Sequence, residues 1–241
     1  LILRRAIMEH DIDIVHTNGS PDNRMALYVS LVTRKKFKVV FTKHNTITIK
    51  NAVSRWRLHK FNAATIFVGD FLDYLGLDKH NPRFHVIPNC IDLGYWQRES
   101  PPETGQRLTL ISNAGASRHK GWQHLMEAIA GLSEDEKNRL SVVLLARHEP
   151  EMAKELAEAG SICEFHFPGF LSDARPWLER ADIGFVLSYK EACSFACREM
   201  LAMGLPVLVS DFMVLVNNID QSCGWVTKSK NGESVRETVR A

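Results

Sequence analysis

Short apolar runs alternate with amphipathic segments along most of the chain. Runs such as SVVLLA (141–146) and DIGFVLS (182–188) are rich in branched apolar residues, which favours buried strands. In the stretches between such runs, apolar residues recur three or four positions apart, which favours helices. Strands that alternate with helices predict parallel sheets built from strand–helix–strand units.

Two such series are expected, and a polar segment that contains Pro-Pro and Gly lies between them. Strands are predicted at 13–16, 37–42, 65–69 and 84–89, and then at 108–112, 141–146, 163–167, 182–188 and 206–210. We therefore predict an α/β protein with two Rossmann-like domains. The expected boundaries are 1–91 for the first domain, 92–106 for a linker and 107–241 for the second domain. Ligands of such sheets bind at the carboxyl ends of the strands.

Charge is distributed unevenly along the 241 residues. Residues 1–100 hold 15 Lys and Arg against 9 Asp and Glu, a balance of +6, whereas residues 101–241 hold 15 against 19, a balance of −4. The ten basic residues between Asp22 and Asp70 have no acid among them. The segment KNAVSRWRLHK (50–60), with Trp56, is therefore either a docking face for an anionic membrane surface or a solvated helix face. No nucleic-acid-binding motif accompanies this charge, so nucleic acid is not an expected partner.

Cysteine usage and the lack of export signals favour a cytoplasmic protein. The five cysteines form no framework of pairs, which fits a reducing compartment. Cys193 and Cys197 are four positions apart, but no cluster of metal ligands accompanies them, so small packing residues are favoured over a metal site. No signal peptide and no apolar run of transmembrane length is present in the sequence.

The stretch YKEACSFACREMLAMGLPVLVSD (189–211) carries the strongest chemical signal. Ser194 suits the N-cap of a helix, and the free N–H groups there would accept an anion such as a diphosphate. Glu191 lies in the loop before this helix. Glu199 lies within the helix, where its carboxylate could accept hydrogen bonds from the vicinal diol of a ribose. The alternative is that Glu199 forms a surface pair with Arg198 or another base.

The order of motifs in this region resembles a known family. Glu191 and Glu199 are followed by an A-x-G-x-P pattern, and three earlier segments fit as well. These are HVIPNCID (85–92), SRHKGWQHLMEAI (117–129) and FPGFLSD (167–173), followed by the strand ADIGFVLS (181–188). Together they resemble the retaining glycosyltransferases of family 4, whose fold is called GT-B. By this resemblance the chain is expected to be truncated at both ends, with an incomplete N-terminal domain.

The resemblance implies a role for each of several residues. Lys120 would contact the phosphates of a nucleotide-sugar donor, together with N–H groups near Ser194 and Phe195. Glu191 would bind hydroxyls of the transferred sugar, and Glu199 the ribose. Catalytic roles are expected for His44, Glu191 and Lys120, with His44 on the acceptor side; a plain strand-end histidine is its alternative.

Other residues of the expected donor site come from neighbouring loops. Phe170 and Leu171 would flank the base. Most family members carry an arginine shortly before the lysine; here the nearest is Arg118, which either replaces it or leaves Lys120 with less help. The family's glycines at two positions are Ala192 and Ser194 here.

The function implied is transfer, with retention, from a UDP-, GDP- or ADP-sugar to a glycan or lipid-linked acceptor. Lipopolysaccharide or surface-polysaccharide assembly is the expected setting, in the cytoplasm or on the inner face of the membrane. No metal and no other cofactor is expected. Two other interpretations stay open: a degenerate GT-B protein that binds nucleotide or glycan without catalysis, and a transferase like glycogen synthase or sucrose synthase.

Overall fold

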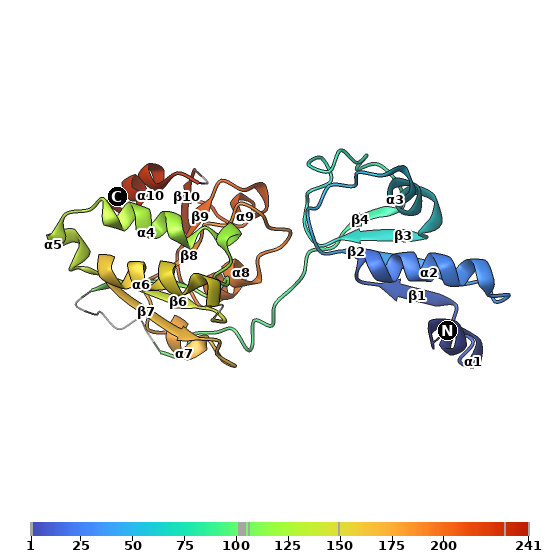
Figure 1. The fold of residues 1–241 in the computed structure, drawn as a ribbon, viewed down its shortest axis with the longest axis horizontal. Helices are drawn as coiled ribbons and strands as arrows, with labels where there is room; N and C mark the ends of the chain where they lie inside the picture. Colours follow the sequence, from blue (N-terminus) through green and yellow to red (C-terminus); the bar gives the residue numbers. More distant parts are fainter. Residues whose placement is uncertain (1, 101–104, 106, 149, 229, 241) are drawn as a thin grey trace. The chain divides into compact units, whose positions relative to one another are not determined.

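Parallel strand pairing organises the protein into two sheets, each flanked by helices, so the predicted α/β class is confirmed. The structure is a computed structural model that describes residues 2–100, 105, 107–148, 150–228 and 230–240. The chain divides into two units, Leu1–Asn89 and Cys90–Ala241 (Figure 1).

The first unit is a four-stranded sheet in the order β1-β2-β3-β4. Its strands are β1 Ile14–Thr17, β2 Lys38–Lys43, β3 Ala64–Phe67 and β4 Phe84–Val86. Its helices are α1 Ile2–Glu9, α2 Ser20–Val32 and α3 Ala52–Trp56, and α3 continues as a π-helical turn over Arg57–Phe61. Each of the four predicted strands is therefore present. Proline in the first turn of α2 suits a helix start, because its missing N–H would have no partner there.

Several bases of the acid-free segment are not free on the surface. Arg57 is only 5% exposed and Lys43 only 6% exposed. Burial lowers the pKa of Lys43 to about 8. Lys35 pairs with Asp11 and Asp13, at 2.6 and 2.8 Å. These three bases are therefore buried or already paired, and of them only Arg57 belongs to the segment 50–60.

The second unit is a six-stranded parallel sheet in the order β10-β9-β8-β5-β6-β7. Its strands are β5 Leu108–Ser112, β6 Leu140–Leu145, β7 Glu164–Gly169, β8 Ile183–Val186, β9 Val207–Ser210 and β10 Gly224–Thr227. Its helices are α4 Trp122–Ala130, α5 Glu134–Lys137, α6 Ala153–Ile162, α7 Arg175–Leu178, α8 Phe195–Ala202, α9 Met213–Val216 and α10 Gly232–Arg240. The strand β10 was not among the strands listed in the prediction.

Helices cover both faces of the second sheet, which explains the nearly continuous apolar strands (Figure 1). In β6, Val142 and Leu144 belong to a core cluster that also contains residues of α4, α6 and α10. Val143 and Leu145 belong to the opposite cluster, with residues of α7, α8 and α9. Alternate side chains of β6 therefore belong to two cores, one on each side of the sheet, so neither face of the strand can be polar.

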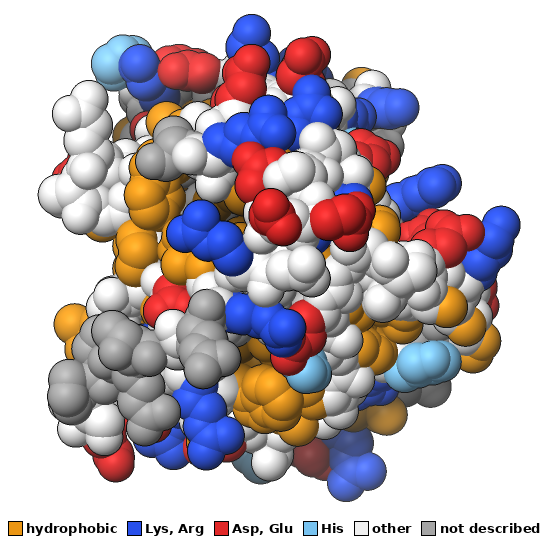
Figure 2. Space-filling model, turned by 90° about the vertical axis from the view of Figure 1, so that its left-hand side faces the viewer, with side chains coloured by type: hydrophobic (Ala, Val, Ile, Leu, Met, Phe, Trp, Pro, Cys, Tyr) orange, Lys and Arg blue, Asp and Glu red, His pale blue; other side chains and the backbone are white. Residues whose placement is uncertain are grey.

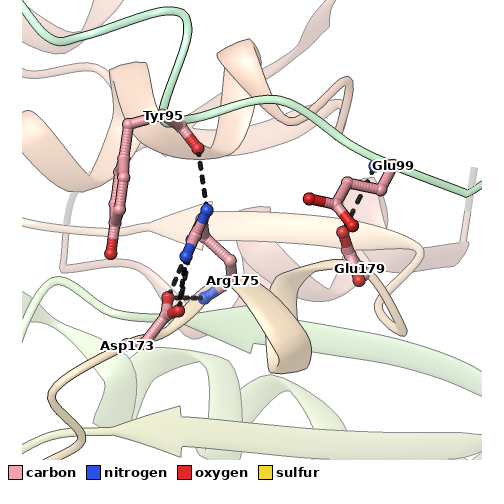
Figure 3. Close-up of polar contacts among 5 residues, drawn as sticks. All are labelled: Tyr95, Glu99, Asp173, Arg175 and Glu179. Atoms are coloured by element: carbon pink, nitrogen blue, oxygen red, sulfur yellow. Dashed lines mark hydrogen bonds and ion pairs between the residues drawn. The ribbon is translucent and has the colours of Figure 1, made fainter.

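The polar segment expected as a linker is docked on the second unit in its described part. Trp96 packs against the core. Arg98 donates to three carbonyl oxygens around the end of α7 at 3.1–3.3 Å. The guanidinium of Arg175 lies 3.9 Å from the ring centroid of Tyr95 and is held by Asp173 at 2.7 Å (Figure 3). These contacts tie residues 95–98 to α7; residues 101–104 and 106 lie outside the described residues.

The surface of the second unit carries both signs of charge. Seen from that side, Lys and Arg are interspersed with Asp and Glu and do not gather into a patch of one sign (Figure 2). Among the described residues, no helix combines the length and the apolar character needed to cross a bilayer.

Candidate functional site

The loops that follow β5 and β8 meet at the carboxyl edge of the second sheet. Gly121, at the start of α4, has a φ of +73°, and a Cβ on it would lie 2.1 Å from the carbonyl oxygen of Leu187. Only glycine permits this approach of backbone to backbone. The N–H of Tyr189 then donates to the carbonyl of His119 at 3.1 Å. The two loops are therefore held together by their main chains.

This packing brings together Lys120 and Glu191. Their Nζ and Oε1 atoms are 2.6 Å apart, and their side chains are 20% and 9% exposed. The neighbouring His119 has a lowered pKa because it is partly buried and because Lys120 lies beside it. A cation and a carboxylate thus share a partly desolvated position, where their interaction is stronger than in water.

Helix α8 begins beside this pair. Ser194 is its N-cap, as predicted, and the Ser194 hydroxyl accepts the N–H of Cys197 at 3.3 Å. Phe195 and Ala196 are the first residues of the helix, so their N–H groups have no acceptor within it, and the positive end of the helix dipole lies at the same place. Phe195 is 45% exposed, whereas Ser194 is 4% exposed. The arrangement suits an anion at the start of the helix.

Glu199 contacts a residue that the sequence did not single out. Its Oε2 accepts from Asn113 Nδ2 at 2.6 Å, and Asn113 follows directly after β5. Burial raises the pKa of Glu199, and the Asn113 bond opposes that shift. Arg198 Nε donates to Asn218 instead, at 3.2 Å. The predicted alternative, a surface pair of Glu199 with a base, is therefore not what the described residues form.

Phe170 and Leu171, after β7, differ in their surroundings. Phe170 is 71% exposed, and the guanidinium of Arg147 lies 5.5 Å from its ring centroid. Leu171 packs against the core cluster beneath the sheet. Arg147 comes just beyond β6, and only its place at a strand's carboxyl end could have pointed to it in the sequence. The exposed ring and its cation form a flat surface that a planar group could stack on.

The remaining predicted residues lie elsewhere. Arg118 Nη2 lies 3.8 Å from Glu155 on α6, and the Arg118 side chain is 84% exposed. His44 belongs to the first unit, where it follows directly after β2. Its Nε2 lies 3.2 Å from Oδ1 of Asn18, which follows β1. Cys197 is buried in the core, as expected of a packing residue. Within the described ranges, no group of three His, Cys, Asp or Glu side chains is placed to hold a metal.

Comparisons with known proteins agree with this geometry. Residues 105–241 match the family model for Glycosyl transferases group 1, and residues 1–95 match the model for Glycosyltransferase Family 4. No curated protein matches the chain by sequence.

Solved structures share the fold. A glycosyltransferase from Rickettsia africae is 17% identical, with a TM-score of 0.82 over 99% of this chain and 68% of that chain. Anabaena HepE in complex with UDP and glucose is 14% identical, with a TM-score of 0.80 over 99% and 70%. WaaG, a glycosyltransferase involved in lipopolysaccharide biosynthesis, is 18% identical, with a TM-score of 0.71 over 99% and 70%. The GT-B fold expected from the sequence is confirmed.

Removing the cation of the central pair should destabilise the second unit. Breaking a fully buried ion pair costs about 3–5 kcal/mol. Because Lys120 is 20% exposed, we expect Lys120→Met to lower the free energy of unfolding by about 2 kcal/mol, measured by urea denaturation. Adding Glu191→Gln should restore part of that loss. The matched change Arg118→Gln should alter stability by less than about 0.5 kcal/mol. If Lys120→Met and Arg118→Gln lowered stability equally, the ion pair of Lys120 with Glu191 would not be what stabilises the unit.

Proposed function

Because the chain belongs to the glycosyl transferases group 1 family, we propose that it transfers a sugar from a nucleoside-diphosphate donor. The observation that carries this proposal is the pairing of Lys120 with Glu191 at 2.6 Å, beside the start of α8. A cation and a helix N-terminus can receive a diphosphate, and a carboxylate can receive sugar hydroxyls. The UDP and glucose bound by the similar Anabaena protein support a UDP-sugar as the donor class.

The chemistry asks for charge stabilisation at the leaving group. Cleavage of the bond between the anomeric carbon and the diphosphate leaves negative charge on the phosphate oxygens. Lys120 and the N–H groups of Phe195 and Ala196 would stabilise that charge as it forms. Glu191 would hold the sugar through its hydroxyls, so that the acceptor attacks an oriented anomeric carbon. We propose that the reaction retains the anomeric configuration, as the family resemblance implies.

Glu199 and the exposed ring of Phe170 would hold the nucleoside. The carboxylate of Glu199, fixed by Asn113 at 2.6 Å, would accept the two hydroxyls of the ribose. The base would stack on Phe170, with Arg147 at its side. His44 stays a prediction on the acceptor side. A glycan or lipid-linked acceptor in lipopolysaccharide or surface-polysaccharide assembly is proposed, and the role printed for WaaG supports it.

A donor panel tests the proposal directly. The protein is incubated with UDP-, GDP- and ADP-sugars, release of the nucleotide is measured, and the product anomer is read by proton NMR. We expect one donor class to be consumed with retention, and Lys120→Met to lower the rate by about 10²-fold. Saturable nucleotide binding without turnover would favour the degenerate, non-catalytic interpretation. Binding of no nucleotide would overturn the proposal.

The role of Glu199 can be measured separately from turnover. Charged hydrogen bonds contribute about 1.5–3 kcal/mol each, so Glu199→Ala should weaken UDP binding by tenfold or more. The ionised carboxylate is the better acceptor, and burial raises the pKa of Glu199. UDP affinity should therefore fall as the pH is lowered through that raised pKa, more steeply in the parent than in Glu199→Ala. Calorimetry at several pH values checks this, and parallel profiles for both proteins would argue against the ribose contact.

Attachment to an anionic membrane surface is proposed for the exposed bases near α3. Lys50, Arg55 and Lys60 are exposed, and Trp56 is 49% exposed. Each base near an anionic surface contributes about 1 kcal/mol, so Arg55→Gln/Lys60→Gln should weaken vesicle binding by roughly 30-fold.

Co-sedimentation with vesicles containing anionic lipid, at low and high salt, measures that binding. The change Arg4→Gln, on the exposed face of α1, serves as the control. If neither salt nor Arg55→Gln/Lys60→Gln changes vesicle binding, this segment is only a solvated helix face.

A further inference from the structure

The first unit contains a pocket whose charged lining is entirely basic. It has a volume of about 380 Å³ and lies between α2 and the segment that contains α3. Arg24 and Tyr28 come from α2, and Asn51, Ser54 and Arg57 come from the α3 segment. None of the described residues that line this pocket is Asp or Glu. We call it the Arg57 pocket.

Arg57 is a buried cation that forms no ion pair with any residue that the structure describes. It is 5% exposed, and its Nη2 donates to the Ser54 hydroxyl at 3.0 Å. Its Nε and Nη1 are buried and have no hydrogen-bond partner among the described residues. Burial lowers the pKa of Arg57, and the nearby positive charge of Arg24 lowers it further. Buried arginines are normally paired, so two arginines that share a pocket without an acid call for an anion.

The local backbone fixes this arrangement before any ligand arrives. The Asn51 side chain caps α3 by accepting the N–H of Ser54 at 2.7 Å. At Arg57 the helix widens into the π-helical turn, where the N–H of Asn62 donates to the Arg57 carbonyl at 2.9 Å. Short π-helical turns occur often at functional sites. The turn thus begins at Arg57, whose Nε and Nη1 have no partner among the described residues.

We propose that the Arg57 pocket binds one phosphoryl group, with Arg57 and Arg24 as the cations and the hydroxyls of Ser54, Ser20 and Tyr28 as further donors. Guanidinium groups form charge-assisted hydrogen bonds with phosphate oxygens, and Nε and Nη1 of Arg57 have no other partner among the described residues. A tetrahedral phosphate also has enough oxygens for several donors on different walls. The site lies in the first unit and does not depend on the proposed donor site. Its phosphate could belong to a small phosphorylated molecule or to a phospholipid headgroup.

Inorganic phosphate is the first probe, titrated by calorimetry into the full chain and into Lys120→Met. Binding that persists in Lys120→Met does not come from the proposed diphosphate site. We expect Arg24→Gln, at an exposed position, to weaken it about tenfold, because one charge-assisted contact is lost. Arg4→Gln, at an exposed position of the same unit but outside the pocket, should change it less than about twofold. Arg57→Gln should abolish binding, with circular dichroism to check folding; if this variant does not fold, Arg24→Gln decides.

Two further probes separate the sources of the phosphate. Glycerol phosphate represents a soluble monoester, and phosphatidylcholine vesicles with and without phosphatidic acid represent a headgroup. If Arg24→Gln weakens binding of glycerol phosphate but not of the vesicles, the pocket binds a small phosphorylated molecule. If Arg24→Gln weakens binding of the phosphatidic acid vesicles, the pocket binds a lipid headgroup. Absence of saturable binding of inorganic phosphate, or equal losses of that binding in Arg24→Gln and Arg4→Gln, would overturn the proposal.

Discussion

Parallel pairing of β5 with β8 is the constraint on which the candidate site depends. In a parallel pair, both strands end at the same edge, so the loops that follow them become neighbours. The register of Leu110 with Ile183 and of Ile111 with Gly184 sets the two ends level. Gly184 also lets α8 approach the sheet, because a Cβ there would lie 2.5 Å from the Met200 sulfur. The start of α8 is thereby held beside the loop of β5.

Electrostatics then decides which side chains can occupy that edge. A half-buried charge needs a partner, since water solvates it only in part. Lys120 and Glu191 satisfy each other across 71 positions of sequence, and Glu199 is satisfied by the amide of Asn113. In the first unit, Arg57 lacks such a partner among the described residues. The second unit thus pairs Lys120 with an acid, whereas in the first unit the Nε and Nη1 of Arg57 are left without a partner among the described residues.

The sequence predicted most where local patterns and burial agree. Apolar runs marked the strands of the second sheet because both faces are buried, and Ser194 marked the start of α8 because only a capping side chain suits that position. Contacts between distant residues were not visible in the same way. Asn113 resembles any polar loop residue until β5 and β8 are paired. Arg57 is buried at the start of a π-helical turn that hydrophobic periodicity does not indicate, so the sequence did not distinguish it from the exposed Arg55.

The ion pair also has a consequence for the proposed donor. A diphosphate that takes Lys120 as its partner removes the counter-charge of Glu191, whose side chain is only 9% exposed. Glu191 must then find hydrogen-bond donors, and the hydroxyls of the attached sugar would supply them. UDP alone would satisfy Lys120 and leave Glu191 without a partner, which is costly for a buried carboxylate. In the proposed function, the pair thus couples recognition of the diphosphate to recognition of the sugar. It would favour the intact donor over the nucleotide product, and it would re-form when the product leaves.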